Sequence, residues 1–421
     1  MNIQSFDVTI IGGGMVGLAL ASALAESDLT VAVIEGKTPS LTIPEQHDIR
    51  VSALSQASKN LLTNVGAWPY IANNRHQPYS AMSVWEKDSF GKIAFDASTL
   101  KGNGEKSLGA IVENNIVQQA LWKTVDAASN VTVFHPYHCQ SVAMGEREAW
   151  ITLVGATDDN KHLTQSITSK LVVGADGANS WLRRQADIQL TSWDYGHNAI
   201  VATIETDMPH DNTARQIFSP EGILAFLPLG NSTSSSSNLC SIVWSLTPDD
   251  AQQLQACDEL EFNRRLTAAF DNRLGYCQVK SQRGVFPLTM RYAQSFVKQR
   301  VALIGDAAHT IHPLAGLGVN LGFLDAAALA QELLEKHQQG KDIGELSSLR
   351  YFERWRKSEA MQMIATMEGF KQLFAGSNPV KKLIRDIGLV AVDKVTPAKE
   401  VFIKHAMGLT DDLPELAKKT K

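Results

Sequence analysis

The chain has 421 residues, which is more than one small hydrophobic core requires, so two or three domains are expected. Its 44% hydrophobic and 20% charged residues are ordinary for a folded globular protein and exclude a disordered or fibrous class. The net charge of -5 gives no general basic field that could hold a polyanion, so nucleic acid is not an expected partner.

The first part of the chain is predicted to form a strand, a helix and a second strand. Residues 7–11 and 30–34 are rich in β-branched side chains, and residues 15–25 favour a helix. The uncharged run from Val8 to Ala25 is just long enough to suggest a signal or membrane segment. Asp7 precedes this run in place of basic residues, and glycines interrupt it, so we interpret it as a βαβ unit instead.

The turn after the first strand carries the pattern GxGxxG at Gly12, Gly14 and Gly17. Such glycines permit a tight turn, a close approach of a pyrophosphate to the backbone, and close packing of the helix on the strand. Free N–H groups and the dipole at the helix N-terminus favour negative phosphates. Glu35 ends the second strand, where a carboxylate can bind a ribose 2'-hydroxyl and would repel a 2'-phosphate. FAD or NAD is therefore the expected bound nucleotide.

A second motif lies in residues 171–180, where an apolar run ends in Gly-Ala-Asp-Gly with Asp176 and Gly177. A helix carrying Arg183 and Arg184 is expected to follow. By itself this pattern is a strand-to-helix turn, and both a structural and a ligand-binding role are open.

The middle of the chain favours an antiparallel sheet, because residues 197–246 contain short β-rich runs at 199–203, 223–227 and 240–244. The serine-rich run 231–238 lies between the last two of these runs. It cannot bury apolar surface and is predicted to be a hairpin loop without chemistry.

The third motif is the apolar run 301–304, which is typical of a buried parallel strand and delivers Asp306 to its carboxyl end. Ligands bind at that end of strands in α/β sheets, and a carboxylate there can accept hydrogen bonds from ribitol or ribose hydroxyls. The glycine-rich segment that follows leads into a helix to about Leu334, whose N–H groups could face a planar ring. Its candidate residues are Pro313, Gly316, Gly318 and Asn320.

From Gly318 onward the pattern is largely helical. Methionine and phenylalanine recur at helical spacing in residues 363–374, where they could line a channel for an apolar tail or simply pack in the core. Residues 380–387 place their apolar side chains on one stripe and three basic side chains off it. Such a helix could pack on the protein itself or dock on anionic lipid or an acidic partner.

The four cysteines show no CxxC pair and no histidine-rich neighbour, so neither a metal site nor a disulfide framework is expected. A reducing cytoplasm fits this pattern. The chain also lacks a second GxGxxG motif. A resident NAD(P)H domain is therefore not expected, and the reductant must visit the site.

In their order along the chain, the three motifs resemble those of single-component flavoprotein aromatic hydroxylases. The resemblance narrows to the FAD-dependent hydroxylases of ubiquinone biosynthesis through residues 48–55 and 109–114. It is nearest to the VisC-type 2-polyprenylphenol 6-hydroxylases. The segments that carry this nearer match are 193–195, 214–216, 221–229, 378–383 and 406–409. Leu317 departs from the family pattern, in which glutamine is frequent at this position.

The resemblance implies a role for each candidate residue. The first motif and Glu35 would bind the ADP half of FAD, Asp176 and Gly177 would serve the pyrophosphate region and the visiting reductant, and Asp306 would hold the ribitol side. The loop from Pro313 to Asn320 would meet the isoalloxazine ring. The residues implied to contact FAD are Gly12, Gly14, Gly17, Glu35, Arg50, Asn114, Asp176, Gly177, Asp306, Pro313, Gly316, Gly318 and Asn320.

The implied activity is monooxygenation of an aromatic ring. NAD(P)H would reduce bound FAD, O2 would form a C4a-hydroperoxide, and one oxygen atom would enter a polyprenylphenol ortho to its hydroxyl. This would be the first ring hydroxylation after decarboxylation in ubiquinone biosynthesis. Three alternatives are open: a different ring-hydroxylation step, a flavin reductase or dehydrogenase of the same superfamily, and a non-enzymatic member of the biosynthetic assembly. Contacts with other ubiquinone-biosynthesis proteins, with the inner membrane and within an oligomer are also open.

The sequence identifies no catalytic base. His309 and His312 flank the expected flavin loop and could accept the phenol proton, but a histidine that caps local backbone is the simpler interpretation. Glu113 could be catalytic, yet a carboxylate at a helix start usually serves the helix dipole.

The expected fold class is α/β. Residues 1–75, 100–185 and 280–345 are predicted to form a discontinuous, doubly wound FAD-binding domain that is Rossmann-like and of the aromatic hydroxylase type. Residues 76–99 and 186–279 are predicted to form an antiparallel β-sheet substrate domain. Residues 346–421 are predicted to form a helical C-terminal region.

Overall fold

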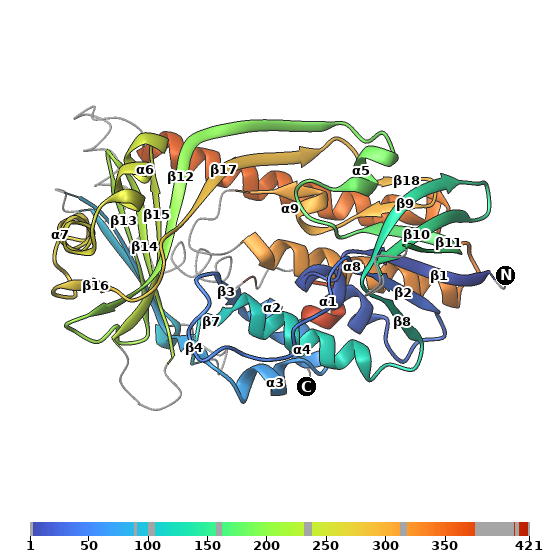
Figure 1. The fold of residues 1–421 in the computed structure, drawn as a ribbon, viewed down its shortest axis with the longest axis horizontal. Helices are drawn as coiled ribbons and strands as arrows, with labels where there is room; N and C mark the ends of the chain where they lie inside the picture. Colours follow the sequence, from blue (N-terminus) through green and yellow to red (C-terminus); the bar gives the residue numbers. More distant parts are fainter. Residues whose placement is uncertain are drawn as a thin grey trace.

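Two large β-sheets lie at opposite ends of the molecule, and most of the helices lie between them or beneath them (Figure 1). The computed structural model describes residues 3–87, 91–99, 106–156, 162–230, 238–311, 318–374, 408 and 412–419. The two sheets differ in strand direction, as the two kinds of sequence pattern predict.

The eight-stranded sheet has the strand order β18-β19-β11-β1-β2-β8, and β9 and β10 extend it through β11. Strands β19, β11, β1, β2 and β8 run parallel to one another, as expected for a doubly wound fold, while β18 and β10 pair with β19 and β11 in the antiparallel direction. The strands are β1 (Gln4–Ile11), β2 (Val31–Ile34), β8 (Val131–Phe134), β9 (Tyr137–Met144), β10 (Ala149–Ala156), β11 (His162–Gly174), β18 (Val297–Lys298) and β19 (Val301–Leu303).

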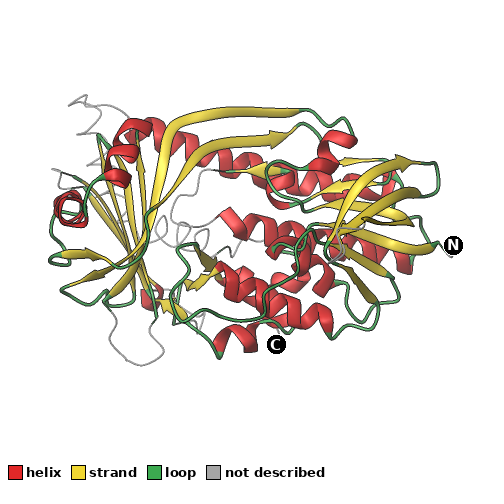
Figure 2. Ribbon diagram, viewed as in Figure 1, coloured by secondary structure: helices red, strands yellow, loops and turns green. Residues whose placement is uncertain are grey.

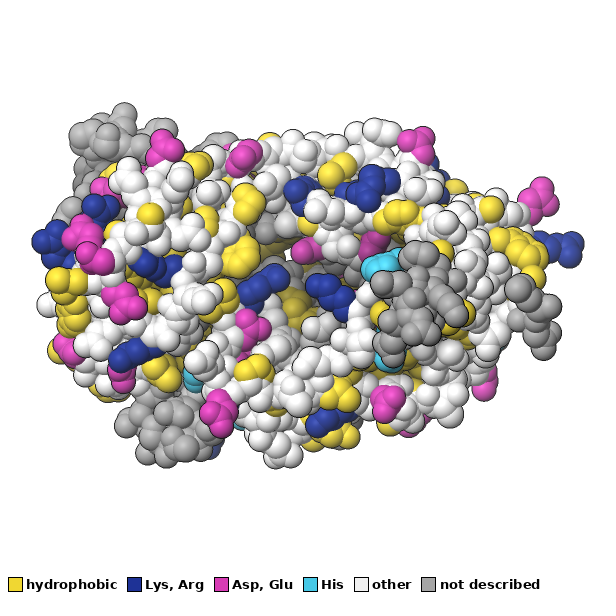
Figure 3. Space-filling model, viewed as in Figure 1, with side chains coloured by type: hydrophobic (Ala, Val, Ile, Leu, Met, Phe, Trp, Pro, Cys, Tyr) yellow, Lys and Arg dark blue, Asp and Glu magenta, His cyan; other side chains and the backbone are white. Residues whose placement is uncertain are grey.

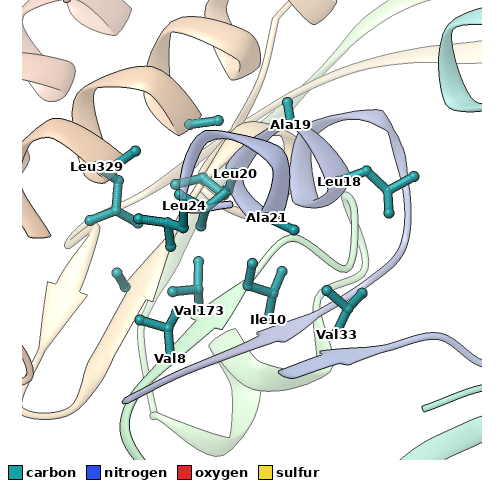
Figure 4. Close-up of a cluster of buried hydrophobic side chains, with 14 of the residues drawn as sticks. Val8, Ile10, Leu18, Ala19, Leu20, Ala21, Leu24, Val33, Val173 and Leu329 are labelled. Carbon is teal, nitrogen blue, oxygen red and sulfur yellow. The ribbon is translucent and has the colours of Figure 1, made fainter. Parts of the chain in front are cut away.

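Helix α1 (Met15–Ala23) packs on this sheet, between α4 (Asn114–Asp126) and α8 (Gly318–Gln338). Val8, Ile10 and Val33 project from β1 and β2 toward the helix and belong to one core cluster with its Leu20 and with Leu24 (Figure 4). All five side chains are fully buried. Burial of each such side chain contributes about 1.5–3 kcal/mol. This core fixes the strand-turn-helix corner that carries the glycine motif.

The nine-stranded sheet has the order β20-β17-β12-β15-β14-β13-β5-β6, with β16 paired to β12. Apart from the parallel pair β13 and β5, its neighbouring strands run antiparallel. The strands are β5 (Ala81–Glu86), β6 (Lys92–Asp96), β12 (Leu190–Thr206), β13 (Thr213–Ser219), β14 (Gly222–Pro228), β15 (Leu239–Leu246), β16 (Cys277–Val279), β17 (Gly284–Ala293) and β20 (His309–Thr310).

The two faces of this sheet have different surroundings. Ile200, Ile204 and Ile242 belong to a core on the outer face, where α6 (Pro248–Ala256) and α7 (Glu259–Ala269) cover the sheet (Figure 2). Because side chains alternate along a strand, Val201 and Val243 lie on the inner face, toward the centre of the molecule.

Strands β12 and β17 extend from the nine-stranded sheet toward the other half of the molecule (Figure 1). The predicted domain boundary at residue 280 would place β17 with the FAD-binding part, yet this strand pairs with β12. Pairing of residues 190–194 with 289–293 makes the two strands one ribbon that joins both halves. The exact division into domains stays a prediction.

A three-stranded sheet of order β3-β7-β4 lies between the larger sheets. Its strands and the remaining elements are β3 (Val51–Ser55), β4 (His76–Tyr79), β7 (Gly109–Glu113), α2 (Gln56–Asn64), α3 (Trp68–Ala72), α5 (Trp181–Gln185), α9 (Leu346–Phe374) and the 3-10 turns η1 (Ala97–Thr99), η2 (Gly305–Ala307) and η4 (Glu415–Ala417). Helix α9 packs on α8 and β18. None of the helices within the described ranges is long and apolar enough to cross a membrane.

The predicted βαβ start and the antiparallel middle are confirmed, and the helical continuation after Gly318 is confirmed as far as Phe374. Residues 231–237, which make up most of the serine-rich run, lie outside the described residues, so the hairpin loop stays a prediction. Residues 380–387 also lie outside the described residues, so the question of their docking stays open.

Candidate active site

A cavity of about 430 Å³ lies between the glycine-motif corner and the inner face of the nine-stranded sheet. On the view of Figure 3 the surface is hollowed between the two halves of the molecule, with basic and hydrophobic side chains at the rim. Six of the predicted FAD-contact residues, far apart in the sequence, line this cavity. They are Gly14, Arg50, Asn114, Gly177, Asp306 and Gly318.

The glycine turn has the geometry that its sequence predicts. Gly12 has a φ of +111°, and a Cβ added to it would lie 2.4 Å from the carbonyl oxygen of Ala175. A Cβ on Gly17 would lie 2.1 Å from the carbonyl oxygen of Gly12, so only glycine permits this close contact between helix and turn. A Cβ on Gly14 would meet nothing within 4 Å. Open space therefore adjoins the N-terminus of α1, which has no side-chain cap and no acidic residue in its first turn. These features fit a pyrophosphate.

Glu35 lies beside this turn. Its Oε2 accepts a hydrogen bond from the Gly13 N–H at 2.8 Å, and its Oε1 accepts one from the Lys37 N–H at 2.9 Å. The carboxylate is thereby oriented by the backbone of the motif. Each carboxylate oxygen keeps a further lone pair for a ribose hydroxyl.

Asp176 serves the fold as well as the expected site. Its Oδ2 accepts hydrogen bonds from the N–H groups of Trp181 and Leu182 at the start of α5, at 2.7 Å and 3.2 Å. Its Oδ1 is buried and has no hydrogen-bond partner among the described residues. The buried Arg183 donates to the carbonyl oxygens of Ala307 and Ala178, at 2.8 Å and 2.9 Å. The second and third motifs are therefore joined directly.

Asp306 follows Gly305, whose φ of +58° makes the turn that presents the carboxylate to the cavity. The Asp306 side chain is exposed to this space, and the structure gives it no hydrogen-bond partner within the described residues. Desolvation by the surrounding protein raises the pKa of Asp306, and the charges of His309, Arg50 and Arg291 only partly oppose this effect. Such a carboxylate is stabilised by a ligand hydroxyl that donates to it.

His309 lies behind this turn and is buried. Its Nε2 lies 2.6 Å from Oδ2 of Asp325, which also accepts the Gly305 N–H at 3.0 Å. Oδ1 of Asp325 accepts a hydrogen bond from Nε of Arg356 at 2.7 Å. Burial alone would raise the pKa of Asp325, but the charges and hydrogen bonds of His309 and Arg356 lower it. His309 therefore caps no local backbone through this nitrogen but pairs with a carboxylate, and His312 lies outside the described residues.

Arg50 and Asn114 meet at the cavity edge, where the Asn114 N–H donates to the Arg50 carbonyl oxygen at 3.0 Å. The Arg50 guanidinium carbon lies 5.8 Å from the centre of the Phe286 ring on β17. The loop that carries Arg50, residues 45–50 (the Arg50 loop), therefore reaches the nine-stranded sheet. The Asn114 Oδ1 accepts a hydrogen bond from Ser52 Oγ at 2.7 Å.

The buried Glu113 holds the Arg50 loop in place. Its carboxylate accepts the Asp48 N–H at 2.8 Å, bonds Nδ1 of His47 at 2.9 Å, and forms a two-point pair with Arg75 at 2.8 Å and 3.0 Å. Burial would raise the pKa of Glu113, but these hydrogen bonds and the Arg75 charge together lower it to about 2. Glu113 makes no side-chain cap for α4, and the described contacts of its carboxylate are with His47, Asp48 and Arg75.

The third motif is described only in part. Pro313 and Gly316 lie outside the described residues, while Gly318 begins α8 beside the cavity, where a Cβ would meet nothing within 4 Å. The Asn320 side chain is buried and bonds the Ala53 carbonyl, the Ser55 N–H and the Ser58 hydroxyl. It ties α8 to the β3–α2 corner, so a contact of Asn320 with flavin would have to use its backbone.

The opposite wall of the cavity comes from the nine-stranded sheet and is mainly apolar. Strand β12 contributes Ala199 and Val201, and β15 contributes Ser241 and Val243. From β17 to β20 and the segment after it, the lining residues are Phe286, Pro287, Leu288, Thr289, Thr310 and Ile311.

Comparisons with known proteins identify the group to which this site belongs. The model of the FAD binding domain family matches residues 5–365. The chain is 35% identical over 410 residues to the 3-demethoxyubiquinol 3-hydroxylase of Escherichia coli (strain K12), covering 97% of this chain and 100% of the relative. It is 34% identical over 455 residues to the mitochondrial ubiquinone biosynthesis monooxygenase COQ6 of Danio rerio, covering 96% and 90%. The chain belongs to the FAD-binding hydroxylases of ubiquinone biosynthesis.

This hydroxylase is an FAD-dependent monooxygenase, and NAD(P)H and O2 are typical co-substrates of its class. The fold agrees: p-nitrophenol 4-monooxygenase PnpA from Pseudomonas putida DLL-E4 superposes with a TM-score of 0.78 at 18% identity, covering 98% of this chain and 100% of that one. The family-level resemblance is thereby confirmed. The nearer match to 2-polyprenylphenol 6-hydroxylases stays a prediction.

Several residues of the hydroxylase site escaped sequence analysis. Asp325 is a single acid within the apolar run from Leu321 to Ala330, and a buried charge in such a run usually has a partner, so this signal was available. Arg356 and Ser241 carry no comparable signal, because only the fold brings them to the site.

Proposed function

We propose that the enzyme hydroxylates the ring of a 2-polyprenylphenol at the open carbon ortho to the phenol hydroxyl, the first ring hydroxylation after decarboxylation. The observation that carries this proposal is the cavity itself. One wall carries the residues expected to hold FAD, and the facing wall is a mainly apolar sheet surface that suits an aromatic ring with an apolar tail.

The cofactor-binding roles are part of the proposal. The open space at Gly14 and the free N–H groups of α1 would hold the pyrophosphate, and Glu35 would accept a ribose hydroxyl. Asp306 would accept a ribitol hydroxyl, and Gly318 at the start of α8 would direct N–H groups at the isoalloxazine. When bound and reduced by NAD(P)H, the flavin supplies activation of O2 and transfer of one oxygen atom.

The protein then has to place the ring and exclude water. Val201, Val243 and Leu288 present apolar surface to the ring, and the Arg50 loop with Phe286 borders the same space. A phenol oxygen donates electron density only to its ortho and para carbons, so the walls must hold one of these carbons toward the flavin side. Exclusion of water favours oxygen transfer to the ring over release of hydrogen peroxide.

A deletion strain tests the step. If the proposal holds, the strain accumulates the unhydroxylated polyprenylphenol, and the purified enzyme incorporates one oxygen atom from labelled O2 into that compound. No incorporation with continued NAD(P)H oxidation would instead support a reductase, and no oxidation with any phenol would support a non-enzymatic role.

A later ring hydroxylation is the second candidate. The observation that favours it is the 35% identity to the Escherichia coli protein named 3-demethoxyubiquinol 3-hydroxylase. Accumulation of an already hydroxylated and methoxylated precursor in the deletion strain would assign this later step. The cofactor and the cavity would be the same in both cases, because the shape of the sheet wall selects the carbon.

We also propose that the enzyme meets its prenylated substrate at the cytoplasmic face of the inner membrane, where the apolar tail resides, alone or with other ubiquinone-biosynthesis proteins. The basic residues Lys381, Lys382 and Arg385 are the candidates for lipid contact. Equal recovery on anionic liposomes of the wild type and of the triple glutamate variant would remove this idea.

A further inference from the structure

The inner face of β12 and β15 carries two hydroxyls next to an otherwise apolar surface. Ala199, Val201 and Val243 line the cavity together with Ser241. Thr203 is the direct partner of Ser241 in the β12–β15 ladder, so both side chains lie on the same inner face. The neighbouring strand positions 200, 202, 240 and 242 belong to the outer core under α6 and α7.

Among the described residues, neither hydroxyl has a hydrogen-bond partner. Ser241 is 0% exposed and Thr203 is 4% exposed, and neither Ser241 Oγ nor Thr203 Oγ1 bonds any group in the described part of the chain. Buried polar atoms in native proteins are nearly always satisfied, because an unsatisfied one loses its bonds to water without compensation. Alanine and valine would fill these two positions at lower cost. Ser241 lines the cavity and Thr203 lies beside it on the neighbouring strand, so the geometry points to a ligand as the missing partner of Ser241.

The expected ligand atom is an oxygen that both donates and accepts. A serine or threonine hydroxyl can act as donor and acceptor, and a phenol hydroxyl can do the same. None of the residues that β12 and β15 contribute to the cavity carries a charge, so these strands offer no countercharge for a carboxylate or phosphate. The apolar neighbours suit the carbon atoms of an aromatic ring.

We propose that Ser241, assisted by Thr203, binds the ring oxygen of the substrate and so determines which ring carbon faces the flavin side of the cavity. This inference rests on the proposed function, since it takes a phenol as the ligand. A fixed oxygen at the sheet wall restricts rotation of the ring in its plane. The two hydroxyls therefore act as specificity determinants, while the flavin supplies the chemistry.

Ligand titrations of the FAD-loaded enzyme test this subsite. The probes are 2-geranylphenol and geranylbenzene, which differ only in the ring hydroxyl, and binding is followed through the flavin absorbance. We expect the wild type to bind the phenol about tenfold more tightly than the hydrocarbon, which corresponds to one net hydrogen bond. Ser241→Ala should abolish this preference through weaker phenol binding, and Thr203→Val should reduce it. Affinity for geranylbenzene should stay within about twofold in both variants.

Ser245→Ala is the matched control. Ser245 lies on the same strand and the same face, but its Oγ already lies 3.1 Å from Nδ1 of His197 and it does not line the cavity. This variant should keep the preference for the phenol. If Ser241→Ala also keeps it, the subsite is wrong while the proposed function stands. If the wild type binds neither probe, the proposed function fails and the subsite fails with it.

Stability separates a ligand role from a structural one. Because Ser241 Oγ has no hydrogen-bond partner in the described part of the chain, Ser241→Ala should leave the thermal midpoint of the ligand-free holoenzyme unchanged or raise it. In turnover, Ser241→Ala should release a larger share of consumed NAD(P)H as hydrogen peroxide, since the ring is held less firmly. A lowered thermal midpoint with unchanged peroxide release would show that the hydroxyl is structural and would overturn the proposal.

Discussion

Nε2 of His309 lies 2.6 Å from Oδ2 of Asp325, and both side chains are buried directly behind the turn that presents Asp306 to the cavity. Asp325 also accepts the Gly305 N–H and pairs with the buried Arg356. The Asp325 carboxylate thus joins the turn of the third motif to helices α8 and α9. It stabilises the position of Asp306 through the backbone of this turn.

We predict that Asp325→Asn destabilises the protein and weakens FAD binding. The substitution leaves the Arg356 charge buried without a countercharge and His309 without a carboxylate partner, and breaking a buried ion pair in this way costs roughly 3 kcal/mol or more. Urea unfolding of the apoprotein and a fluorescence titration with FAD measure the two effects. Asp249→Asn, on the exposed start of α6, should change neither quantity. Normal stability and normal FAD affinity in Asp325→Asn would show that the network is dispensable.

Glu113 gives a prediction about pH. Its pKa is lowered from 4.5 to about 2 in the folded protein, so the carboxylate stabilises the fold above pH 4.5 and this contribution is lost as the pH falls toward 2. At neutral pH, Glu113→Gln should lower the free energy of unfolding by about 3 kcal/mol. The difference between the two proteins should shrink when unfolding is measured at successively lower pH within this window. A difference independent of pH would contradict the assignment of the charge.

The same variant should also loosen the loop that carries Arg50. His47, the Asp48 N–H and Arg75 all bond the Glu113 carboxylate, and the Arg50 guanidinium borders the cavity. We expect faster proteolysis or amide exchange in residues 45–50 of Glu113→Gln, with exchange in β1 unchanged apart from the global loss of stability.

The glycine motif was predictable because its residues are close together in the sequence and their spacing alone fixes the turn. The position of Glu35 at the end of the second strand was predictable for the same reason, because the lengths of the strand and helix before it are regular. The partners of Glu113 and Asp325 were not predictable. His47, Arg75 and Arg356 come from separate elements, and only packing of the whole chain brings each one to its carboxylate. The strand pattern likewise predicts that Ser241 and its neighbours Cys240 and Ile242 point to opposite faces of the sheet. It does not show that the face with Ser241 lines the cavity.

Asp176 shows a further limit. The sequence places it at a strand end beside a glycine, where both a ligand role and a capping role are physically reasonable. In the structure one oxygen caps α5 and the other is buried without a partner among the described residues. Oδ2 of Asp176 therefore has the capping role, and Oδ1 remains available for a ligand. A residue pattern cannot distinguish the two oxygens of one carboxylate.

Two glycine substitutions should separate binding from folding. Gly14→Val should fold, because a Cβ at this position meets nothing within 4 Å, but its side chain would occupy the space expected for the pyrophosphate, so bound FAD should be lost. Gly17→Ala should lower stability itself, because its Cβ would lie 2.1 Å from the Gly12 carbonyl oxygen. Flavin absorbance after purification and circular dichroism of the apoproteins distinguish the two. Full FAD content in a well-folded Gly14→Val would show that the pyrophosphate binds elsewhere.

Asp306 should show opposite effects on stability and on cofactor binding. Desolvation by the surrounding protein raises its pKa above 3.8, so the folded apoprotein loses stability as the pH rises from 3.8 to the folded pKa. Asp306→Ala should therefore unfold at a higher temperature than the wild-type apoprotein at pH 7, and this gain should disappear as the pH is lowered to about 3.8.

The same variant should bind FAD more weakly, because the acceptor for a ribitol hydroxyl is gone. Asp306→Asn keeps an acceptor oxygen without the charge, so its apoprotein should gain similar stability while its FAD affinity falls less. Thermal scans of the three apoproteins at several pH values and parallel FAD titrations give both quantities. If Asp306→Ala retained full FAD affinity, the carboxylate would have no part in holding the cofactor, and the open cavity beside it would need another explanation.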